Sequence, residues 1–181
     1  DCGECIRLCP HHAKKAVYDR KSDFDGKFQY TVALPAPSLY GQFNNLDDVD
    51  YVLTGLKHIG FDDVFEVATA AEIVSDYTRR ILAGKTALEV KRPMISTACP
   101  AVVRLIQVKF PDLLPNLLPV LTPAELAGKL AKREAAKKTG LSPSEIGTFF
   151  ISPCPAKVTS ARTPIGMHES YIDGVLSMSS V

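Results

Sequence analysis

The stretch Thr148-Phe149-Phe150-Ile151-Ser152-Pro153-Cys154-Pro155-Ala156-Lys157 decides much of the fold of this chain. Its opening residues are β-branched or aromatic and predict a buried strand, which ends where prolines fix φ and remove backbone donors. Cys154 therefore stands at the point where a strand stops. Ligands of open α/β sheets bind at the carboxyl ends of the strands, so this thiol is a candidate ligand for a metal or cluster.

The same order of strand, turn and helix recurs along the chain. Two capping boxes, Thr69 with Glu72 and Thr122 with Glu125, predict helix starts. Alternating strands and helices imply right-handed crossovers, so the predicted fold class is α/β with a mostly parallel sheet flanked by helices. The predicted strands are residues 30–34, 63–67, 93–96, 148–151 and 171–176. The predicted helices cover residues 46–59, 69–81, 100–110 and 123–138.

A second cysteine segment, Ser96-Thr97-Ala98-Cys99-Pro100-Ala101, has a similar setting. Cys99 follows the predicted strand 93–96, and Pro100 is typical of a first helical position. Cys99 and Cys154 are therefore expected at one edge of the sheet. The positive end of a helix dipole favours a thiolate at Cys99. Either cysteine alone could equally be a small buried hydrophobe, but the shared edge favours ligation.

The third cysteine segment is Cys2-Gly3-Glu4-Cys5-Ile6-Arg7-Leu8-Cys9-Pro10. Iron–sulfur runs of the ferredoxin type read C-x2-C-x2-C-x3-C-P, and this segment matches all but the first cysteine. Residues 1–27 are therefore predicted to be the remnant of a ferredoxin-like 4Fe–4S region, attached loosely to a larger domain of residues 28–181. The chain is expected to be a piece of a longer polypeptide.

Composition limits the class of protein. The 181 residues are 46% hydrophobic and carry a formal net charge of +1, which allows a core and gives no reason to expect a nucleic-acid partner. No apolar run reaches the ~18 residues that a membrane span needs. Five cysteines in unpaired spacings fit a reducing cytoplasm better than a disulfide framework.

These segments together resemble the large subunit of the iron-only (FeFe) hydrogenases over nearly the whole chain. In that family, a T-S-C-C-P-G-W segment supplies a proton-relay cysteine and then a cluster ligand, and an M-P-C-x-x-K segment supplies the next ligand and a lysine. Residues 97–101 resemble the first segment and residues 152–157 the second. Further elements of the family resemble Ala36-Pro37-Ser38, Phe110-Pro111-Asp112-Leu113 and Leu121-Thr122-Pro123.

The resemblance implies an H-cluster, which is a 4Fe–4S cubane joined through a cysteine to a two-iron unit with carbon monoxide and cyanide ligands. It implies that Cys99 and Cys154 bind the cubane and that Lys157 meets a cyanide of the two-iron unit. The family's C-x3-C segment, with two more cubane ligands, is missing, so the chain alone is expected to hold no H-cluster and to be inactive. Further cofactor contacts are expected from Ala36, Pro37 and Ser38, and ferredoxin-type cluster ligands from Cys2, Cys5 and Cys9.

Two departures from the family pattern bear on function. Ala98 stands in place of the relay cysteine, and Ser160 in place of a glutamate of the proton path. Because proton transfer needs a group of suitable pKa, these changes favour a divergent, sensory branch that reacts with hydrogen or protons at low turnover and reports to a signalling domain. The alternatives are a catalytic hydrogenase that uses a ferredoxin-like electron carrier, and a non-catalytic relative of the cluster-assembly type.

Overall fold

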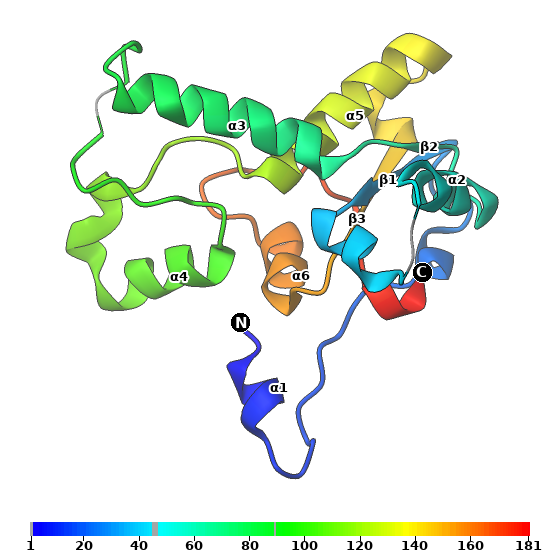
Figure 1. Cartoon of the computed structure of the whole chain (residues 1–181), viewed down its shortest axis with the longest axis horizontal. Coiled ribbons are helices and arrows are strands. Elements are labelled where there is room, and N and C mark those ends of the chain that lie inside the picture. The colour runs from blue at the N-terminus through cyan, green and yellow to red at the C-terminus, as the bar shows by residue number, and fades with distance from the viewer. Residues whose placement is uncertain (1, 45–46, 89) are drawn as a thin grey trace.

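The computed structural model describes residues 2–44, 47–88 and 90–181, and Figure 1 shows a sheet with helices packed around it. The sheet of the described residues has four strands in the order β2-β1-β3-β4, and all of them are parallel. This confirms the predicted α/β class with a parallel sheet flanked by helices. The strands are β1 (Tyr30–Pro35), β2 (Asp63–Val64), β3 (Ile146–Ile151) and β4 (Gly174–Leu176).

Helices connect these strands and extend the molecule to one side of the sheet (Figure 1). The α-helices of the described residues are α1 (Glu4–Leu8), α2 (Asp50–His58), α3 (Val67–Leu82), α4 (Pro100–Lys109), α5 (Pro123–Thr139) and α6 (Pro155–Arg162). The shorter 3-10 helices are η1 (Lys21–Phe24), η2 (Pro37–Gln42), η3 (Pro111–Asn116), η4 (Pro143–Glu145) and η5 (Met178–Ser180).

Side chains alternate along β1, so each face of the sheet has its own packing partner. Val32 and Leu34 belong to a core with α5 and the start of α3, whereas Ala33 belongs to a core with α2. α3 and α5 pack against each other above the sheet (Figure 1). Gly128 allows α5 to lie close to the backbone of Tyr171, because a Cβ at position 128 would be 2.5 Å from the Tyr171 carbonyl oxygen.

The core on the α2 side of the sheet, called the second core below, contains Phe149 of β3, which is 1% exposed. Its ring centroid lies 5.0 Å from that of Phe24, 6.0 Å from that of Phe28 and 5.9 Å from that of Phe61. Such edge-on and tilted ring contacts add to the free energy gained by burial. Because Phe24 and Phe28 precede β1, the N-terminal part of the chain helps to build the core.

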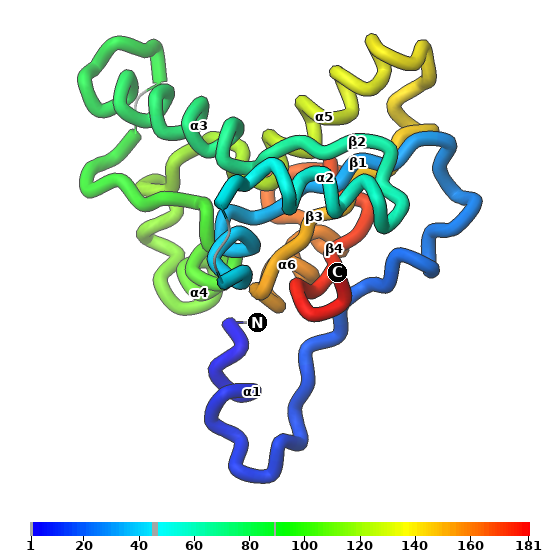
Figure 2. The backbone as a smooth tube through the Cα atoms, turned by 45° about the vertical axis from the view of Figure 1, so that its right-hand side comes forward, coloured from blue at the N-terminus to red at the C-terminus, as the bar shows by residue number. Residues whose placement is uncertain are grey.

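The N-terminal segment makes an excursion that leaves the α/β body and returns to it, with α1 on the way (Figure 2). At its start Gly3 adopts a φ of 85° and faces Pro155, whose Cγ would lie 3.2 Å from a Cβ. At its end the Asp19 N–H donates to the Val175 carbonyl at 3.0 Å. The end of the segment is therefore bonded to the body, and its start lies close to the first residue of α6. That residues 1–27 derive from a ferredoxin-like region stays a prediction.

Residues 93–96 do not form the predicted strand of the sheet. Ile95 instead makes an isolated parallel bridge with Leu117, and its N–H donates to the Asn116 carbonyl at 2.8 Å. The buried Asn116 side chain donates to the Pro93 carbonyl, also at 2.8 Å. These contacts occupy the backbone groups that a ladder would use, so the segment lies outside the sheet.

The start of α3 also differs from the prediction. β2 ends at Val64 and α3 begins at Val67, so Thr69 lies in the first turn and its predicted capping box with Glu72 does not form. Val67 is 5% exposed, and its burial in the core favours the earlier helix start. β4 is likewise shorter than the predicted strand 171–176. Residue 46, the first of the predicted helix 46–59, lies outside the described residues.

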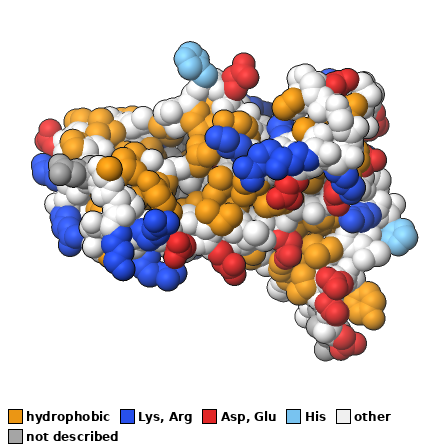
Figure 3. Space-filling model, turned by 90° about the horizontal axis from the view of Figure 1, so that it is seen from above, with side chains coloured by type: hydrophobic (Ala, Val, Ile, Leu, Met, Phe, Trp, Pro, Cys, Tyr) orange, Lys and Arg blue, Asp and Glu red, His pale blue; other side chains and the backbone are white. Residues whose placement is uncertain are grey.

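Seen from above, hydrophobic side chains lie open between groups of lysine and arginine (Figure 3). On α3, Ile73 and Leu82 are about half exposed. Exposed apolar surface of this kind, when it is contiguous, is typical of contact with another protein surface. Among the described residues, no helix is both long and apolar enough to cross a lipid bilayer.

Asp63 joins β2 to α2 and α5 through ion pairs. Its carboxylate lies 2.8 Å from Lys138 Nζ and 3.2 Å from Lys57 Nζ. Partial burial acts to raise the pKa of Asp63, but hydrogen bonds from Lys138, the Val64 amide and Lys57 outweigh it and lower that pKa to about 2. The charged form of Asp63 therefore stabilises the folded state.

We expect Asp63→Asn to lower the free energy of unfolding by ~1 kcal/mol at pH 7, since both lysines are largely solvent-exposed. The folded-state pKa, about 2, lies below the unfolded value of ~3.9. The stabilisation is therefore present above pH ~4, falls to roughly half by pH ~3 and is lost as the pH drops through the folded-state pKa. Urea unfolding of wild type and variant at pH 7, 4 and 3 measures it.

The control for this prediction is Asp76→Asn, which removes an exposed pair with Arg79 at 3.6 Å. Such a pair is worth only about 0.3–0.5 kcal/mol on a helix surface. A loss at Asp63 no larger than the control, or one that does not shrink toward pH 3, would contradict the prediction.

Candidate functional site

Cys154 lies at the carboxyl end of β3, as the sequence predicts. The preceding Ser152 is 3% exposed, and its backbone N–H donates to the Leu176 carbonyl at 3.0 Å. Its hydroxyl accepts a hydrogen bond from the Cys154 N–H at 3.2 Å. Cys154 is the N-cap residue of α6, with Pro155 at the first helical position. The end of the sheet and the start of α6 thus fix this loop together.

Cys99 does not lie at the end of a sheet strand, because residues 93–96 are outside the sheet. It is instead the N-cap residue of α4, followed by Pro100. α4 packs against α6, and Pro100 and Ala156 line one small space between the two helices. Cys99 is exposed and Cys154 is partly buried. The two thiols thus begin neighbouring helices, whose N-termini carry partial positive charge.

Lys157 connects the two cysteine segments. Its ammonium group, Nζ, donates to the Ala98 carbonyl at 2.8 Å, across 59 positions of sequence. Burial lowers the pKa of Lys157 below its ordinary value, and the nearby negative charges of Cys154, Cys99 and Glu125 oppose this shift. A partly buried cation between two thiols favours an anionic ligand at this place.

The cysteines of the N-terminal segment are not brought together in a ligand set. Cys2 and Cys5 are exposed and Cys9 is partly buried. Hydrogen bonds from the backbone at residues 13 and 11 lower the pKa of the Cys9 thiol below its ordinary value. Cys2 and Cys99 line one shallow groove along α4. In the described part of the chain, no three His, Cys, Asp or Glu residues are grouped so that they could hold a metal ion.

The turn after β1 lies at the same edge of the sheet as the Cys154 loop. Pro35 pairs with Ile151 in the parallel register, and the Ala36 N–H donates to the Ile151 carbonyl at 3.0 Å. Ala36 is buried, whereas Pro37 and Ser38 are exposed. Their predicted contact with a cofactor stays a prediction.

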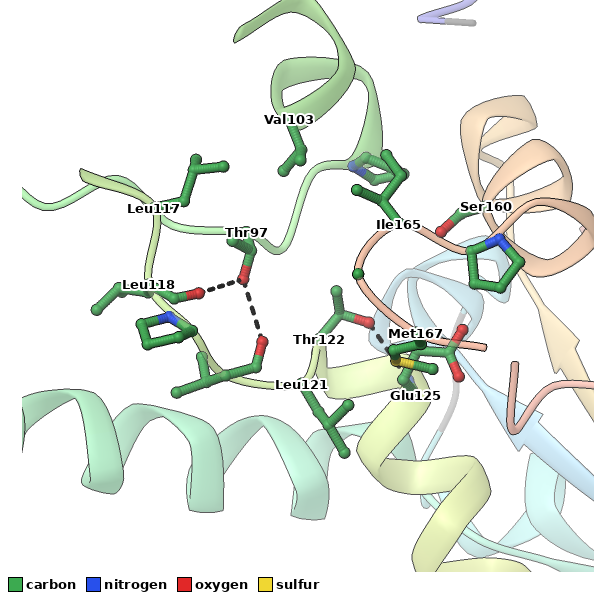
Figure 4. A pocket seen from close by; sticks show the side chains of 15 residues that line it. Thr97, Val103, Leu117, Leu118, Leu121, Thr122, Glu125, Ser160, Ile165 and Met167 are labelled. Atoms are coloured by element: carbon green, nitrogen blue, oxygen red, sulfur yellow. Dashed lines mark hydrogen bonds between the residues drawn. The ribbon is translucent and has the colours of Figure 1, made fainter. Parts of the chain in front are cut away.

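A cavity of about 440 Å³ lies beside the site, between the start of α4 and the loop that follows α6 (Figure 4). Its walls are mainly apolar, and Ser160 lines it from α6. Thr97 points its hydroxyl toward the carbonyls of Leu118 and Val120, each at 3.3 Å (Figure 4). The hydroxyl can donate to one of these at a time, so Thr97 fixes the chain just before Cys99.

Glu125, on the wall of the same cavity, has a role that the sequence reasoning missed. Its N–H donates to the Thr122 hydroxyl at 3.3 Å, as a capping box predicts. Its carboxylate, however, accepts hydrogen bonds from the Ser170 hydroxyl at 2.7 Å and from the Tyr171 N–H at 2.8 Å. This buried carboxylate therefore joins α5 to the approach to β4. The local pattern gives no signal for partners 45 and 46 positions away.

Tyr18 is a second residue near the site that no sequence motif indicates. Its hydroxyl donates to the Pro153 carbonyl at 2.7 Å. Burial raises the pKa of Tyr18, and the negative charge of Cys154 adds to the rise. The tyrosine therefore lies close to the candidate ligand. Ala98 is exposed and lines a second cavity of about 340 Å³ against α3.

A model of the family described as the iron-only hydrogenase large subunit, C-terminal domain, matches residues 29–181. The chain belongs to this family. The resemblance inferred from the cysteine segments is confirmed, and the chain is a member of a family of hydrogenase-like iron–sulfur proteins.

Two relatives illustrate the similarity, both at low sequence identity. The NADP-reducing hydrogenase subunit HndD of Solidesulfovibrio fructosivorans is 24% identical over 182 aligned positions, which cover 91% of this chain and 31% of HndD. The cytosolic Fe–S cluster assembly factor nar1 of Aspergillus clavatus is 33% identical over 106 positions, which cover 55% of this chain and 18% of that protein.

A solved structure of a hydrogenase shows the same fold. The apo FeFe-hydrogenase HydA1 variant from Chlamydomonas reinhardtii superimposes with a TM-score of 0.68 at 21% identity, over 86% of this chain and 42% of HydA1. The hydrogenase-family chain described here therefore spans less than half of HydA1 and about a third of HndD.

Proposed function

We propose that this chain is one lobe of a sensory iron–sulfur protein of the hydrogenase family. In it, Cys99 and Cys154 supply two ligands to an H-cluster that reacts with hydrogen or protons at low turnover. The observation that carries the proposal is the bond from Lys157 to the Ala98 carbonyl, at 2.8 Å. It holds an ammonium group between the two thiol-bearing segments, which is the place that a cofactor with cyanide ligands would need.

The donor set fits such a cofactor in its chemistry and supplies about half of the ligands of a cubane. Thiolates are the soft ligands of iron–sulfur clusters, and a cubane takes about four of them. This lobe offers Cys99 and Cys154, so other ligands come from the rest of a longer polypeptide. When bound, the cofactor would supply the redox chemistry of hydrogen. The chain's own residues would hold it, and Lys157 would donate a hydrogen bond to its anionic side.

The surface of α4 supports the role of a lobe. Val102, Leu105 and Val108 are 40%, 52% and 70% exposed, and their spacing of three places them along one side of the helix. Cys99 begins this helix and shares a groove with these side chains. Another part of the polypeptide would cover these three apolar side chains and supply the remaining ligands next to Cys99.

The sensory assignment follows from the groups that could move a proton. Position 98 lies beside the Lys157 ammonium but carries a methyl group. Ser160 lines the cavity with a hydroxyl, whose pKa is unsuited to proton relay near neutral pH. Slow proton delivery suits detection better than turnover. A cytoplasmic setting, ferredoxin-type clusters on residues 1–27 and a signalling domain as partner complete the proposal.

A cluster analysis of the matured longer polypeptide tests this function. We expect infrared bands of carbon monoxide and cyanide ligands in the wild type, and their loss with most of the bound iron in Cys99→Ser and in Cys154→Ser. Cys5→Ser is the matched control, since it should reduce the iron content of the N-terminal segment and leave the infrared bands unchanged. The 181-residue chain alone should hold no H-cluster.

The second candidate is a non-catalytic protein of the cluster-assembly type, favoured by the 33% identity to the assembly factor nar1. It would bind 4Fe–4S clusters through the same cysteines. A wild-type polypeptide that holds iron and sulfide but shows no infrared bands after maturation would favour this candidate over the sensor. Bands together with rapid hydrogen turnover would favour a catalytic hydrogenase.

A further inference from the structure

The N-terminal excursion meets the Cys154 loop through Tyr18, a residue that belongs to none of the cysteine segments. The hydroxyl of Tyr18 donates to the Pro153 carbonyl at 2.7 Å, and the two residues are 135 positions apart in sequence. Pro153 directly precedes Cys154. The Tyr18 ring also packs against the core cluster that contains α5 and β3. A side chain packed in the core therefore holds the loop of residues 152–154, called the ligand loop below, through the carbonyl that precedes Cys154.

Asp19 fixes the position of Tyr18. Its backbone N–H and its carboxylate bind the carbonyl and the N–H of Val175, at 3.0 Å and 2.9 Å. The other carboxylate oxygen pairs with Arg162 at 2.5 Å. Asp19 is thus bound both to β4 and to the last residue of α6. Tyr18 has little freedom to move away from the loop.

The inner side of the loop is held separately. The hydroxyl of the buried Ser152 accepts from the Cys154 N–H at 3.2 Å. With Ser152 on one side and Tyr18 on the other, the backbone before the thiol is bonded from two directions. Outer partners of this kind orient metal ligands and tune the metal that they hold.

We propose that Tyr18 is a positioning residue for Cys154. It sets the direction of the thiol through the Pro153 carbonyl and links the N-terminal cysteine segment to the cluster ligand. The role of Cys154 as a ligand rests on the function proposed above, whereas the restraint on the loop is a property of the chain itself. The two can therefore fail separately.

The test compares Tyr18→Phe, which removes only the hydroxyl, with wild type. In the full chain without cofactor, alkylation of Cys154 by iodoacetamide under native conditions should become about three- to ten-fold faster, the range that loss of one hydrogen bond gives to a local opening equilibrium. Cys99 serves as the internal reference and should react at an unchanged rate. Mass spectrometry resolves the two sites.

The matched control is Tyr30→Phe. It removes a tyrosine hydroxyl that donates to Asp63 at 3.3 Å, at the opposite end of β1 from the site. Its alkylation rates at both cysteines should equal those of wild type. In the matured longer polypeptide, the EPR spectrum and midpoint potential of the cluster should change in Tyr18→Phe and not in Tyr30→Phe.

Equal alkylation of Cys154 in Tyr18→Phe and wild type would overturn the proposal. So would an equal acceleration at Cys99 and Cys154, since that indicates general loosening. If Cys154 responds selectively while the wild-type polypeptide binds no cluster, the proposed function fails and the positioning of the loop stands. If the loaded protein keeps its spectrum and potential in Tyr18→Phe, the hydroxyl does not position the ligand.

Discussion

Replacing Ala98 with cysteine is expected to raise hydrogen turnover of the matured polypeptide by about 10²–10⁴-fold, the usual contribution of one positioned proton-transfer group. The carbonyl of Ala98 accepts the hydrogen bond from Lys157, so a thiol at this position would stand beside the proposed cofactor. Ala98 is exposed and lines a cavity, so the added sulfur has room. The measurement is hydrogen evolution with a chemical reductant.

The control for Ala98→Cys is Ala83→Cys, which adds a thiol at the exposed C-cap of α3 and should leave turnover unchanged. Adding Ser160→Glu to Ala98→Cys should increase the gain further, because the family resemblance implies a proton-path glutamate at position 160. Wild-type turnover as fast as that of relatives with the relay cysteine would defeat the sensory proposal and establish a catalytic hydrogenase.

The second large effect concerns stability. Phe149→Ala should lower the free energy of unfolding by about 3–5 kcal/mol, the cost of truncating a buried phenylalanine. The ring is 1% exposed and contacts three other phenylalanine rings. These rings come from different parts of the backbone and cannot all move into the space left. Since domains are stable by about 5–15 kcal/mol, the loss would be a large part of the total. Urea unfolding followed by circular dichroism measures it.

Phe43→Ala is the control for this prediction, since Phe43 is 48% exposed and its truncation should cost below about 1 kcal/mol. Phe149→Leu should fall between the two, because it fills part of the volume. A loss at Phe149 close to that of Phe43 would mean that the aromatic cluster does not carry the second core.

The elements that the sequence predicts well are those specified by their own residues. β1 and β3 are rich in β-branched, aromatic and other apolar residues and are bounded by turn residues. α4 and α5 begin where proline and a capping threonine place them. The family resemblance lies in short cysteine segments, whose spacing is also a local property of the sequence. Local chemistry was sufficient in each of these cases.

The failures have a common physical cause. Residues 93–96 have the composition of a strand, but Asn116 binds the Pro93 carbonyl and Ile95 bridges to Leu117, so pairing elsewhere overrides propensity. The predicted position of Cys99 at the sheet edge was wrong for the same reason, because it depended on the predicted strand 93–96. Contacts between distant residues, such as Tyr18 with Pro153 or Glu125 with Ser170, produce no periodicity that a local pattern could show. These contacts shape the candidate site.

The N-terminal excursion begins and ends on either side of Cys154, with Gly3 close to Pro155 and the Tyr18 hydroxyl bonded to the Pro153 carbonyl. The entropy of closing a flexible loop grows only with the logarithm of its length, and doubling the length costs just ~0.6 kcal/mol. The stretch between the two anchors can therefore be lengthened, shortened or exchanged for a whole module at little thermodynamic cost. Evolution can alter what this excursion carries while the geometry at Cys154 stays the same.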